Sequence, residues 1–144
     1  MDYQIGRPGR IAAARLYEGE DIIESIEALA RKEGIQAAAV LVTGGLRKGH
    51  LVVGPRREGP IVPDGRDVEG PGEILGAGTL YPDEAGPKLH LHVGMGRGDR
   101  PVVGCLRGGV SSTFLILEVT IIELDGIQGR RVLDREQAVK LLTL

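Results

Sequence analysis

The feature that most restricts the fold is a single helical segment near the start of the chain, followed almost entirely by strand-like segments. In "EDIIESIEALARKEG" (Glu20–Gly34), Ile22, Ile26 and Leu29 recur at helical spacing. Acidic residues lead the segment, basic residues close it, and Gly34 is a C-cap candidate, so both ends suit the helix dipole. The sequence therefore predicts one well-defined helix here.

Strand patterns fill most of the remaining chain. Strands are predicted at residues 10–19, 35–45, 50–57, 72–81, 88–95, 101–106 and 112–124. Residues 58–72 are rich in Gly, Pro and charge, which predicts a loop, and Asp134 with Gln137 three residues later predicts a short C-terminal helix. One early helix followed by closely linked strands indicates an α+β fold with a largely antiparallel sheet.

Composition sets the broad class. The 144 residues suit a single domain covering residues 1–144. Aromatic residues make up 3%, so the core must be aliphatic and no platform for stacking single-stranded nucleic acid is expected. A net charge of −2 does not favour direct nucleic-acid binding. The lone Cys105 excludes an internal disulfide and, with no long apolar run for a membrane span, leads us to expect a cytoplasmic protein.

The strand "KLHLHVGMG" (Lys88–Gly96) holds two of the three histidines. Because alternate strand residues share a face, His90 and His92 lie on one side, and the leucines and valine between them lie on the other. If Gly98 and Asp99 form the turn of a two-residue hairpin, His92 lies opposite Cys105, and His90 lies opposite Arg107. The pattern thus gathers two imidazoles, the only thiol and a guanidinium.

Two histidines and a cysteine form a ligand set that suits zinc, with a fourth position left for water or a substrate oxygen. The predicted site is therefore a metal site at His90, His92 and Cys105. The alternative is a half-exposed strand face with two solvated histidines and a cysteine that acts as a small core residue.

Three further side chains are candidates for chemistry near such a site. Glu118 interrupts an apolar strand, where it faces water, pairs with an arginine or acts as an acid–base group. Arg107 and Arg47 are candidates for holding an anion, although Arg47 also suits a solvated loop. His50 is expected at the surface or an interface and not as a ligand.

The chain resembles the PPC domain, which plants and prokaryotes share and which accompanies AT-hooks in plant nuclear proteins. The resemblance covers roughly residues 10–124 and leaves residues 125–144 as a C-terminal extension. It rests on the ordered pieces "RLYEGEDIIESIEALARKEGI", "GGLRKGHL", "GEILGAGTLYP", "KLHLHV", "VVGCLRGG" and "FLILEVTIIEL". The segment "GRPGR" (Gly6–Arg10) has the centre of an AT-hook but lacks its basic flank, since Ile5 precedes it.

The resemblance implies a curved sheet, a homotrimer and a metal site at which His90 and His92 match the family's H-x-H. Cys105 stands where the family often has a third histidine, which changes the expected metal preference. The fold also resembles that of acetolactate decarboxylase, a zinc enzyme. Three functions follow as hypotheses: a regulatory or ligand-binding module, associated with DNA through protein partners or binding a small anion; a zinc-dependent lyase or hydrolase; and a direct DNA-binding protein.

Overall fold

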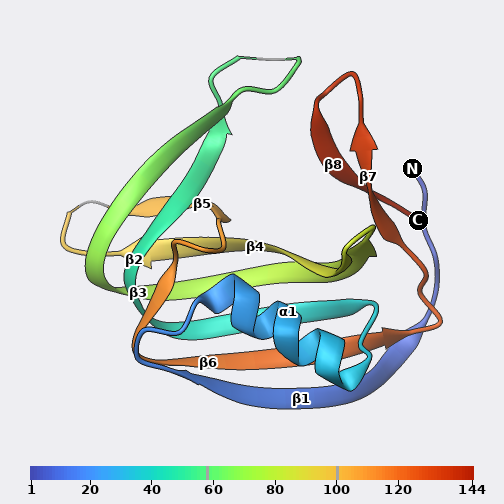
Figure 1. Ribbon diagram of the computed structural model, residues 1–144, viewed down its shortest axis with the longest axis horizontal. Helices are drawn as coiled ribbons and strands as arrows, with labels where there is room; N and C mark the ends of the chain where they lie inside the picture. The colour runs from blue at the N-terminus through green and yellow to red at the C-terminus, as the bar shows by residue number, and fades with distance from the viewer. Residues whose placement is uncertain (58, 100) are drawn as a thin grey trace.

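The computed structural model describes residues 1–57, 59–99 and 101–144. Its elements follow the chain as β1 (Arg7–Tyr17), α1 (Ile22–Glu33), β2 (Ala38–Pro55), β3 (Pro63–Asp83), β4 (Gly86–Gly96), β5 (Val102–Leu106), β6 (Ser112–Asp125), β7 (Arg130–Asp134) and β8 (Val139–Thr143) (Figure 1). The predicted α+β class with a curved antiparallel sheet is confirmed. No helix within the described residues is long and apolar enough to cross a membrane.

Six strands form the main sheet in the order β1-β6-β2-β3-β4-β5, and every pairing is antiparallel. The short β5 also pairs with the outer part of β2, so the strands β2 to β5 curl back on themselves. The close approach of β5 to β2 requires glycine at position 104, because a Cβ there would lie 2.7 Å from the Val52 carbonyl oxygen.

Helix α1 forms where the sequence predicts it. The Asp21 side chain accepts a hydrogen bond from the Glu24 N–H at 2.9 Å, and Gly34 ends the helix in the left-handed conformation with φ of 69°. Ile22, Ile26 and other apolar residues of the helix pack on one side of the sheet. Each fully buried aliphatic side chain contributes about 1.5–3 kcal/mol, so this contact is the main stabilising layer.

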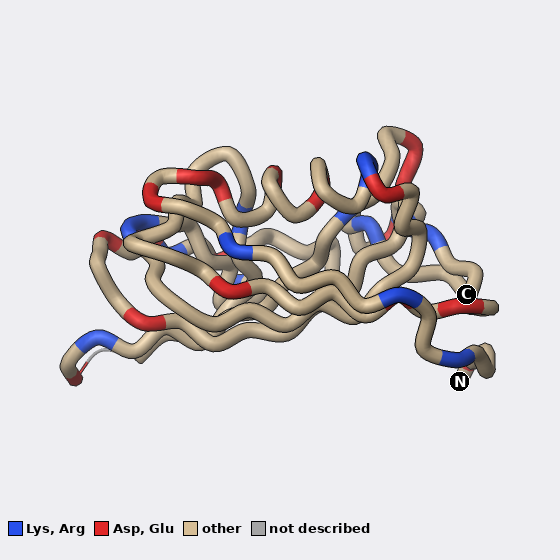
Figure 2. Tube along the Cα trace, turned by 90° about the horizontal axis from the view of Figure 1, so that it is seen from below, with Lys and Arg blue, Asp and Glu red and all other residues tan. Residues whose placement is uncertain are grey.

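The opposite side of the sheet carries no helix, as the edge view in Figure 2 shows. We call this side the open face and define it by the aligned residues Ile11, Leu41, Leu75, His92 and Cys105, together with His90. Register places Leu41, His92 and Cys105 in one row across the sheet, because Leu41 pairs with Ala77, Ala77 with His92, and His92 with Cys105. A parallel row joins Ile11 to His90 through their paired residues. The sheet therefore has one covered face and one face open to solvent or a partner.

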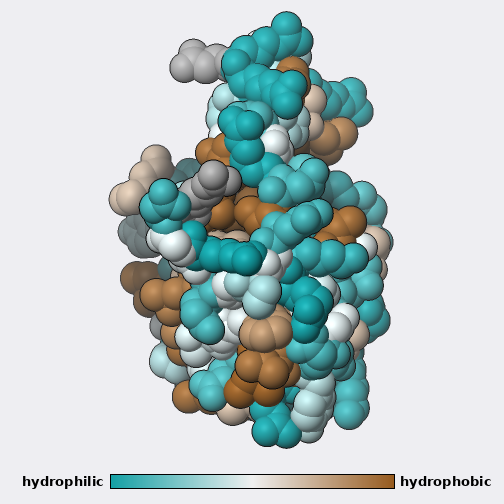
Figure 3. Space-filling view, turned by 90° about the vertical axis from the view of Figure 1, so that its left-hand side faces the viewer, coloured by the Kyte–Doolittle hydropathy of each residue, from teal (hydrophilic) through white to brown (hydrophobic). Residues whose placement is uncertain are grey.

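Two arms project beyond β4 and β5. The first arm is the outer part of β2 and β3, residues 48–55 and 63–69, whose tip is largely hydrophilic (Figure 3). The second arm is the β7–β8 hairpin (Figure 1). The tips touch, because the Ile61 N–H donates to the Gln137 carbonyl at 3.0 Å.

The strands and the loop that the sequence predicts around the first arm differ from those in the structure. The predicted strands at 35–45 and 50–57 are one strand, β2, whose register shifts between Leu46 and Lys48. The predicted loop at 58–72 is a loop only as far as Val62; β3 begins at Pro63, and Glu58 lies outside the described residues. Pairing with the long strand β2 outweighs the local Gly and Pro signals. Residues 63–69 pair with β2 alone, so this part of β3 is an edge, where proline is tolerated.

The predicted C-terminal helix is wrong, because residues 130–143 form the β7–β8 hairpin. The predicted capping interaction of Asp134 does form, but it lies in a turn and not at the start of a helix. The Asp134 carboxylate accepts hydrogen bonds from the Glu136 and Gln137 N–H groups, both at 2.9 Å, which stabilises the turn between the two strands. An Asp side chain that bonds nearby N–H groups starts either a helix or a turn, and strand pairing decides which one forms.

Candidate metal centre

The two sides of β4 differ sharply in burial. Leu89, Leu91 and Val93 face the helix side and are 6%, 0% and 1% exposed. His90 and His92 lie between them on the open face and are exposed. The alternation of the sequence therefore places both imidazoles on the same side of one rigid strand, as predicted.

The predicted hairpin register is confirmed. His92 pairs with Cys105 across β4 and β5, and the ladder continues from there to Met95 and Val102. The expected pairing of His90 with Arg107 is not among the ladder pairs, because β5 ends at Leu106 and the Arg107 N–H donates to the His50 carbonyl at 3.0 Å. Cys105 is thus brought to the histidines by strand pairing alone.

The potential ligand atoms of His90, His92 and Cys105 lie within 4.8 Å of one another. The two histidine Nε2 atoms are 2.9 Å apart. Two zinc–nitrogen bonds of about 2.05 Å at a tetrahedral angle place the nitrogens roughly 3.3 Å apart, so the imidazoles need to separate by only a few tenths of an ångström. The donor set and spacing fit a metal ion such as zinc.

The surroundings of the metal-free cluster favour the neutral forms of His90 and Cys105. Partial desolvation of the imidazole lowers the pKa of His90, and the nearby Arg131, His92 and Arg107 lower it further. Burial raises the pKa of the Cys105 thiol, while Arg107 and Arg131 act against this rise. Neutral imidazole is the ligand form of histidine, whereas the thiol would release its proton on binding a metal.

The cluster opens into a cleft of about 800 Å³ between the two arms. Its basic lining residues are Lys88, Arg107, Arg131 and Lys140, and among the described residues no Asp or Glu lines it. Most of the remaining lining is apolar, for example Val52. A cleft of this size and composition is typical of sites for small ligands.

Arg131 and Lys140 were not predicted as site residues. Both lie on the second arm, which the sequence suggested was partly helical, and the arm brings them against β3 and β4. Arg131 donates from Nη2 to the Thr79 Oγ1 at 2.9 Å, while Lys140 donates to the Asp83 carboxylate at 2.8 Å. The only local signal in the sequence was the pair of adjacent arginines at 130–131.

The structure does not bring Arg47 or His50 to the cluster. Arg47 pairs with Glu18, and its guanidinium carbon lies 4.9 Å from the centroid of the Phe114 ring. The His50 Nδ1 lies 2.6 Å from an Asp67 carboxylate oxygen. Both side chains thus have partners at other places on the molecule.

Glu118 is exposed on the open face, as predicted for a polar outer side, where it pairs in register with Arg15 on β1 and Thr43 on β2. It is not among the residues that line the cleft. Strands β2 and β3 separate it from β4, and three strand spacings of about 4.8 Å put it roughly 14 Å from the histidines.

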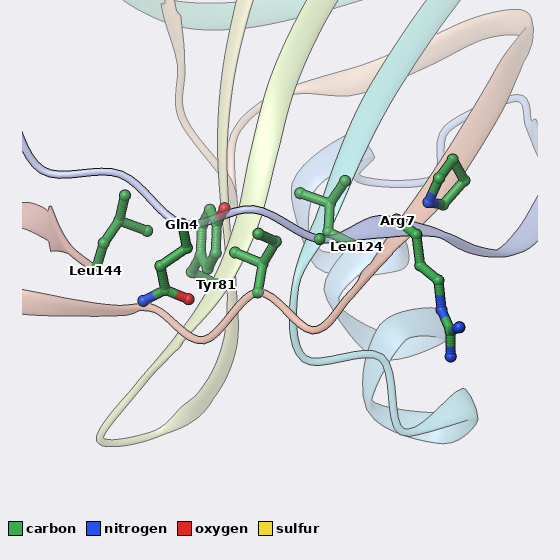
Figure 4. Close-up of a pocket in the computed structure, with 8 residues that line it drawn as sticks. Gln4, Arg7, Tyr81, Leu124 and Leu144 are labelled. Atoms are coloured by element: carbon green, nitrogen blue, oxygen red, sulfur yellow. The ribbon is translucent and has the colours of Figure 1, made fainter.

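A second, smaller cavity of about 380 Å³ lies where the N-terminal segment passes the end of β6. Figure 4 shows Gln4 and Tyr81 next to each other there, with the Arg7 side chain directed away from them. Arg7 pairs with Asp125 at 2.8 Å, and no His or Cys is among the described residues that line the cavity. This cavity offers no ligand set comparable to that of the metal cluster.

Comparisons place the chain among known families. The family model of the Plants and Prokaryotes Conserved (PCC) domain, abbreviated PPC above, matches residues 3–125. No curated protein matches the chain.

Solved structures share the fold. A metal-containing protein from Archaeoglobus fulgidus has a TM-score of 0.88 and 23% identity, with 100% of both chains covered. A candidate DNA-binding protein from Ralstonia eutropha has a TM-score of 0.77 and 19% identity, with 92% of this chain and 90% of that chain covered. Acetolactate decarboxylase from Bacillus subtilis has a TM-score of 0.50 and 17% identity, with 78% of this chain and 51% of the enzyme covered. The TM-scores show a shared fold, and with identities below 25% these neighbours show the fold alone.

Proposed function

The chain belongs to the Plants and Prokaryotes Conserved domain family, and we propose that it is a metal-dependent module that binds a small ligand. The observation that supports this proposal is the convergence of His90, His92 and Cys105 at the floor of a basic cleft. The metal-containing neighbour from Archaeoglobus fulgidus is consistent with it. We propose zinc as the metal, because two imidazoles and a thiolate are ligands that it favours.

Three protein ligands would leave a tetrahedral zinc ion one open coordination position. A bound zinc ion supplies a Lewis acid at that position. Arg107 and Arg131 line the same cleft, and neither is paired with a carboxylate in the part of the chain that the structure describes. They are suited to hold the negative group of a ligand beside the metal.

The metal content of protein purified without metal-affinity resin tests the proposal. We expect about one equivalent of zinc per chain, or uptake of one equivalent by the metal-free protein in calorimetry. Replacing a ligand in His92→Ala should weaken zinc binding by about a hundredfold or more, because only two protein ligands remain.

Cys105→His is the matched variant, because it restores the residue that the family often has at this position. We expect this variant to keep zinc binding, and its cobalt-loaded form to lack the sulfur-to-metal absorption of the wild type. Less than about a tenth of an equivalent of metal, with no uptake on dialysis against zinc, contradicts the proposal.

We also propose that the protein forms a homotrimer through its open face. Ile11, Leu41 and Leu75 on that face are 69%, 49% and 73% exposed, and contact between chains would bury these apolar side chains. Light scattering should give three times the 15.3 kDa mass of one chain. A single-chain mass at micromolar concentration contradicts this assembly.

A zinc-dependent lyase or hydrolase is the second candidate, and the cleft next to the cluster favours it. In this function, Arg107 or Arg131 would orient an anionic substrate beside the cluster, and a bound zinc ion would supply a Lewis acid. Glu118, placed on another part of the open face, would need a partner subunit or a large movement to contribute. Incubating the zinc-loaded protein with acetolactate and measuring carbon dioxide tests this candidate, and release no faster than with metal-free protein counts against it.

Association with DNA is a further proposal, either through protein partners, as in plant relatives, or directly. The fold neighbour from Ralstonia eutropha motivates it. However, basic and acidic residues are interspersed along the chain (Figure 2), and the net charge is −2. Direct binding would appear as salt-dependent fluorescence anisotropy of a labelled duplex at about 150 mM salt, and we expect none.

A further inference from the structure

Arg131 has unsatisfied hydrogen-bonding capacity in the cleft. It is 7% exposed and is the only buried cationic side chain among the described residues. Its Nη2 donates to the Thr79 Oγ1 at 2.9 Å and to the Thr79 carbonyl at 3.2 Å. Its Nε is buried and has no hydrogen-bond partner within residues 1–57, 59–99 and 101–144.

Other buried charges in the molecule are paired. The Glu27 carboxylate lies 3.1 Å from the Lys88 ammonium group, and the Asp83 carboxylate lies 2.8 Å from that of Lys140. No carboxylate in the described chain pairs with Arg131, and burial lowers the pKa of its guanidinium. A buried guanidinium without a counter-charge is costly, so its position calls for an anion from outside the chain.

The position of the guanidinium is fixed beside the metal cluster. Thr79, which accepts both of its hydrogen bonds, pairs directly with His90 across β3 and β4. Directly opposed side chains have Cβ atoms about 4.5–5.5 Å apart, so an anion bound to Arg131 lies within reach of the cluster. The second arm holds the arginine there, because Lys140 on β8 bonds to both Asp83 and Glu84.

The remaining surface of the cleft limits the kind of ligand. Lys88 and Lys140 are already paired with acids, which leaves Arg107 and Arg131 as the cations free to bind an anion among the described lining residues. The walls are mostly aliphatic, including Val53. A ligand that matches both features has one anionic end and an apolar body.

We propose that Arg131 is the anion-binding residue of the cleft and that the ligand is a small organic carboxylate with an apolar chain. Its carboxylate accepts a hydrogen bond from the part of the Arg131 guanidinium that lines the cleft, while its chain lies along the aliphatic walls. This inference rests on the proposed ligand-binding function, but it does not require that the metal be bound.

Hexanoate is a suitable probe, with hexanamide as its uncharged analogue and inorganic phosphate as an anion without a chain. Calorimetry on metal-free and zinc-loaded protein should detect hexanoate binding that is at least about tenfold tighter than that of either control, because a charged hydrogen bond contributes about 1.5–3 kcal/mol. Equal binding of hexanoate and hexanamide overturns the proposal. So does tighter binding of phosphate, or no hexanoate binding in either form of the protein.

Arg131→Gln should weaken hexanoate binding about tenfold or more, while Arg130→Gln, an exposed neighbour on the same strand, should leave it unchanged. If the glutamine variant does not fold, Arg131→Lys tests the same point, because it keeps the charge but loses the planar donors. Unchanged binding in a folded Arg131 variant overturns the proposal. A crystal structure of the assembled protein with a partner subunit's carboxylate on Arg131 would also overturn it.

Zinc titration of the same variants separates this proposal from the metal site. Arg131→Gln should still take up zinc, since its side chain is not a metal ligand. Loss of carboxylate binding with intact zinc uptake supports both proposals. Zinc uptake without any carboxylate binding by the wild type removes only the role of Arg131, and carboxylate binding without zinc uptake removes only the metal site.

Discussion

On one side of β4, leucine and valine side chains are packed under α1; on the other side, His90 and His92 face the cleft. The two sets alternate along a single strand, so they share the same backbone and differ only in what covers them. The covered side stabilises the fold through aliphatic burial, while the open side carries polar groups that stability does not require. Substitutions on the two sides of this strand should therefore have separable effects.

The largest effect is expected on the covered side. Leu91 is 0% exposed, and Leu91→Ala should lower the free energy of unfolding by about 2–5 kcal/mol, because it leaves a cavity beneath the helix. Urea denaturation at pH 7 and fixed chain concentration measures this change. His90→Ala, one residue away on the open side, should change stability by less than about 0.5 kcal/mol while it weakens zinc binding. Equal destabilisation by both variants would contradict the separation.

A smaller effect is expected where α1 covers the unpaired edge of β4. β5 pairs with β4 only from His92 onward, and the Glu27 carboxylate accepts the Leu89 N–H at 3.0 Å. Glu27→Leu should cost about 1–3 kcal/mol, because it leaves that buried N–H without an acceptor. Glu24→Leu, an exposed position on the same helix, is the control for denaturation and should have little effect.

The anchor of the second arm should depend on pH. The Lys140 hydrogen bond, together with the Ala85 N–H, lowers the pKa of Asp83. The ionised Asp83 carboxylate therefore stabilises the fold above the ordinary aspartate pKa of about 3.9. This stabilisation is lost as the pH falls through the lowered folded-state pKa.

Asp83→Asn should destabilise the protein at pH 7 by about 1 kcal/mol or less, since Lys140 is 38% exposed and partly screened by water. Urea midpoints of the two proteins should converge as the pH is lowered below about 3. Glu84→Gln, at a position that is 73% exposed, should have a smaller effect at pH 7. A gap between wild type and Asp83→Asn that widens on acidification would contradict this account.

The smallest effect is expected on the open face away from the cleft. Glu118→Gln should change stability by less than about 0.5 kcal/mol and zinc affinity by less than about twofold, because Glu118 is exposed and does not line the cleft. Calorimetric zinc titrations of Glu118→Gln, His92→Ala and the wild type measure these differences in affinity. A large loss of zinc binding in Glu118→Gln would contradict this and would mean that Glu118 influences the metal cluster, for example from a neighbouring subunit of a trimer.

Much of the candidate site could be predicted from local patterns. The alternation in "KLHLHV" gave the shared side of the two histidines, and the Gly98–Asp99 turn gave the pairing of His92 with Cys105. These predictions succeed because a strand has a period of two and a short turn fixes the register. The helix was predicted correctly as well, because its apolar spacing and its capping residues indicate the same element.

The second arm could not be predicted in the same way. Asp134 and Gln137 favour a helix start and a turn equally well, and only pairing of β7 with β8 and contact with β3 select the turn. The long β3 was missed for a similar reason, because its glycines and prolines oppose a strand locally while pairing with β2 favours it. Arg131 was consequently absent from the predicted site.

The sequence by itself determined the single helix, the apolar and polar sides of β4, and the register that joins Cys105 to the histidines. These features depend on residues close together in the chain, where periodicity and turn geometry suffice. Only the tertiary structure decided that two arms enclose the cluster and that Arg131 lies buried and without a carboxylate partner beside it. Such contacts join residues about fifty positions apart, such as Arg131 and Thr79, and their free energy comes from packing and burial that no local pattern encodes.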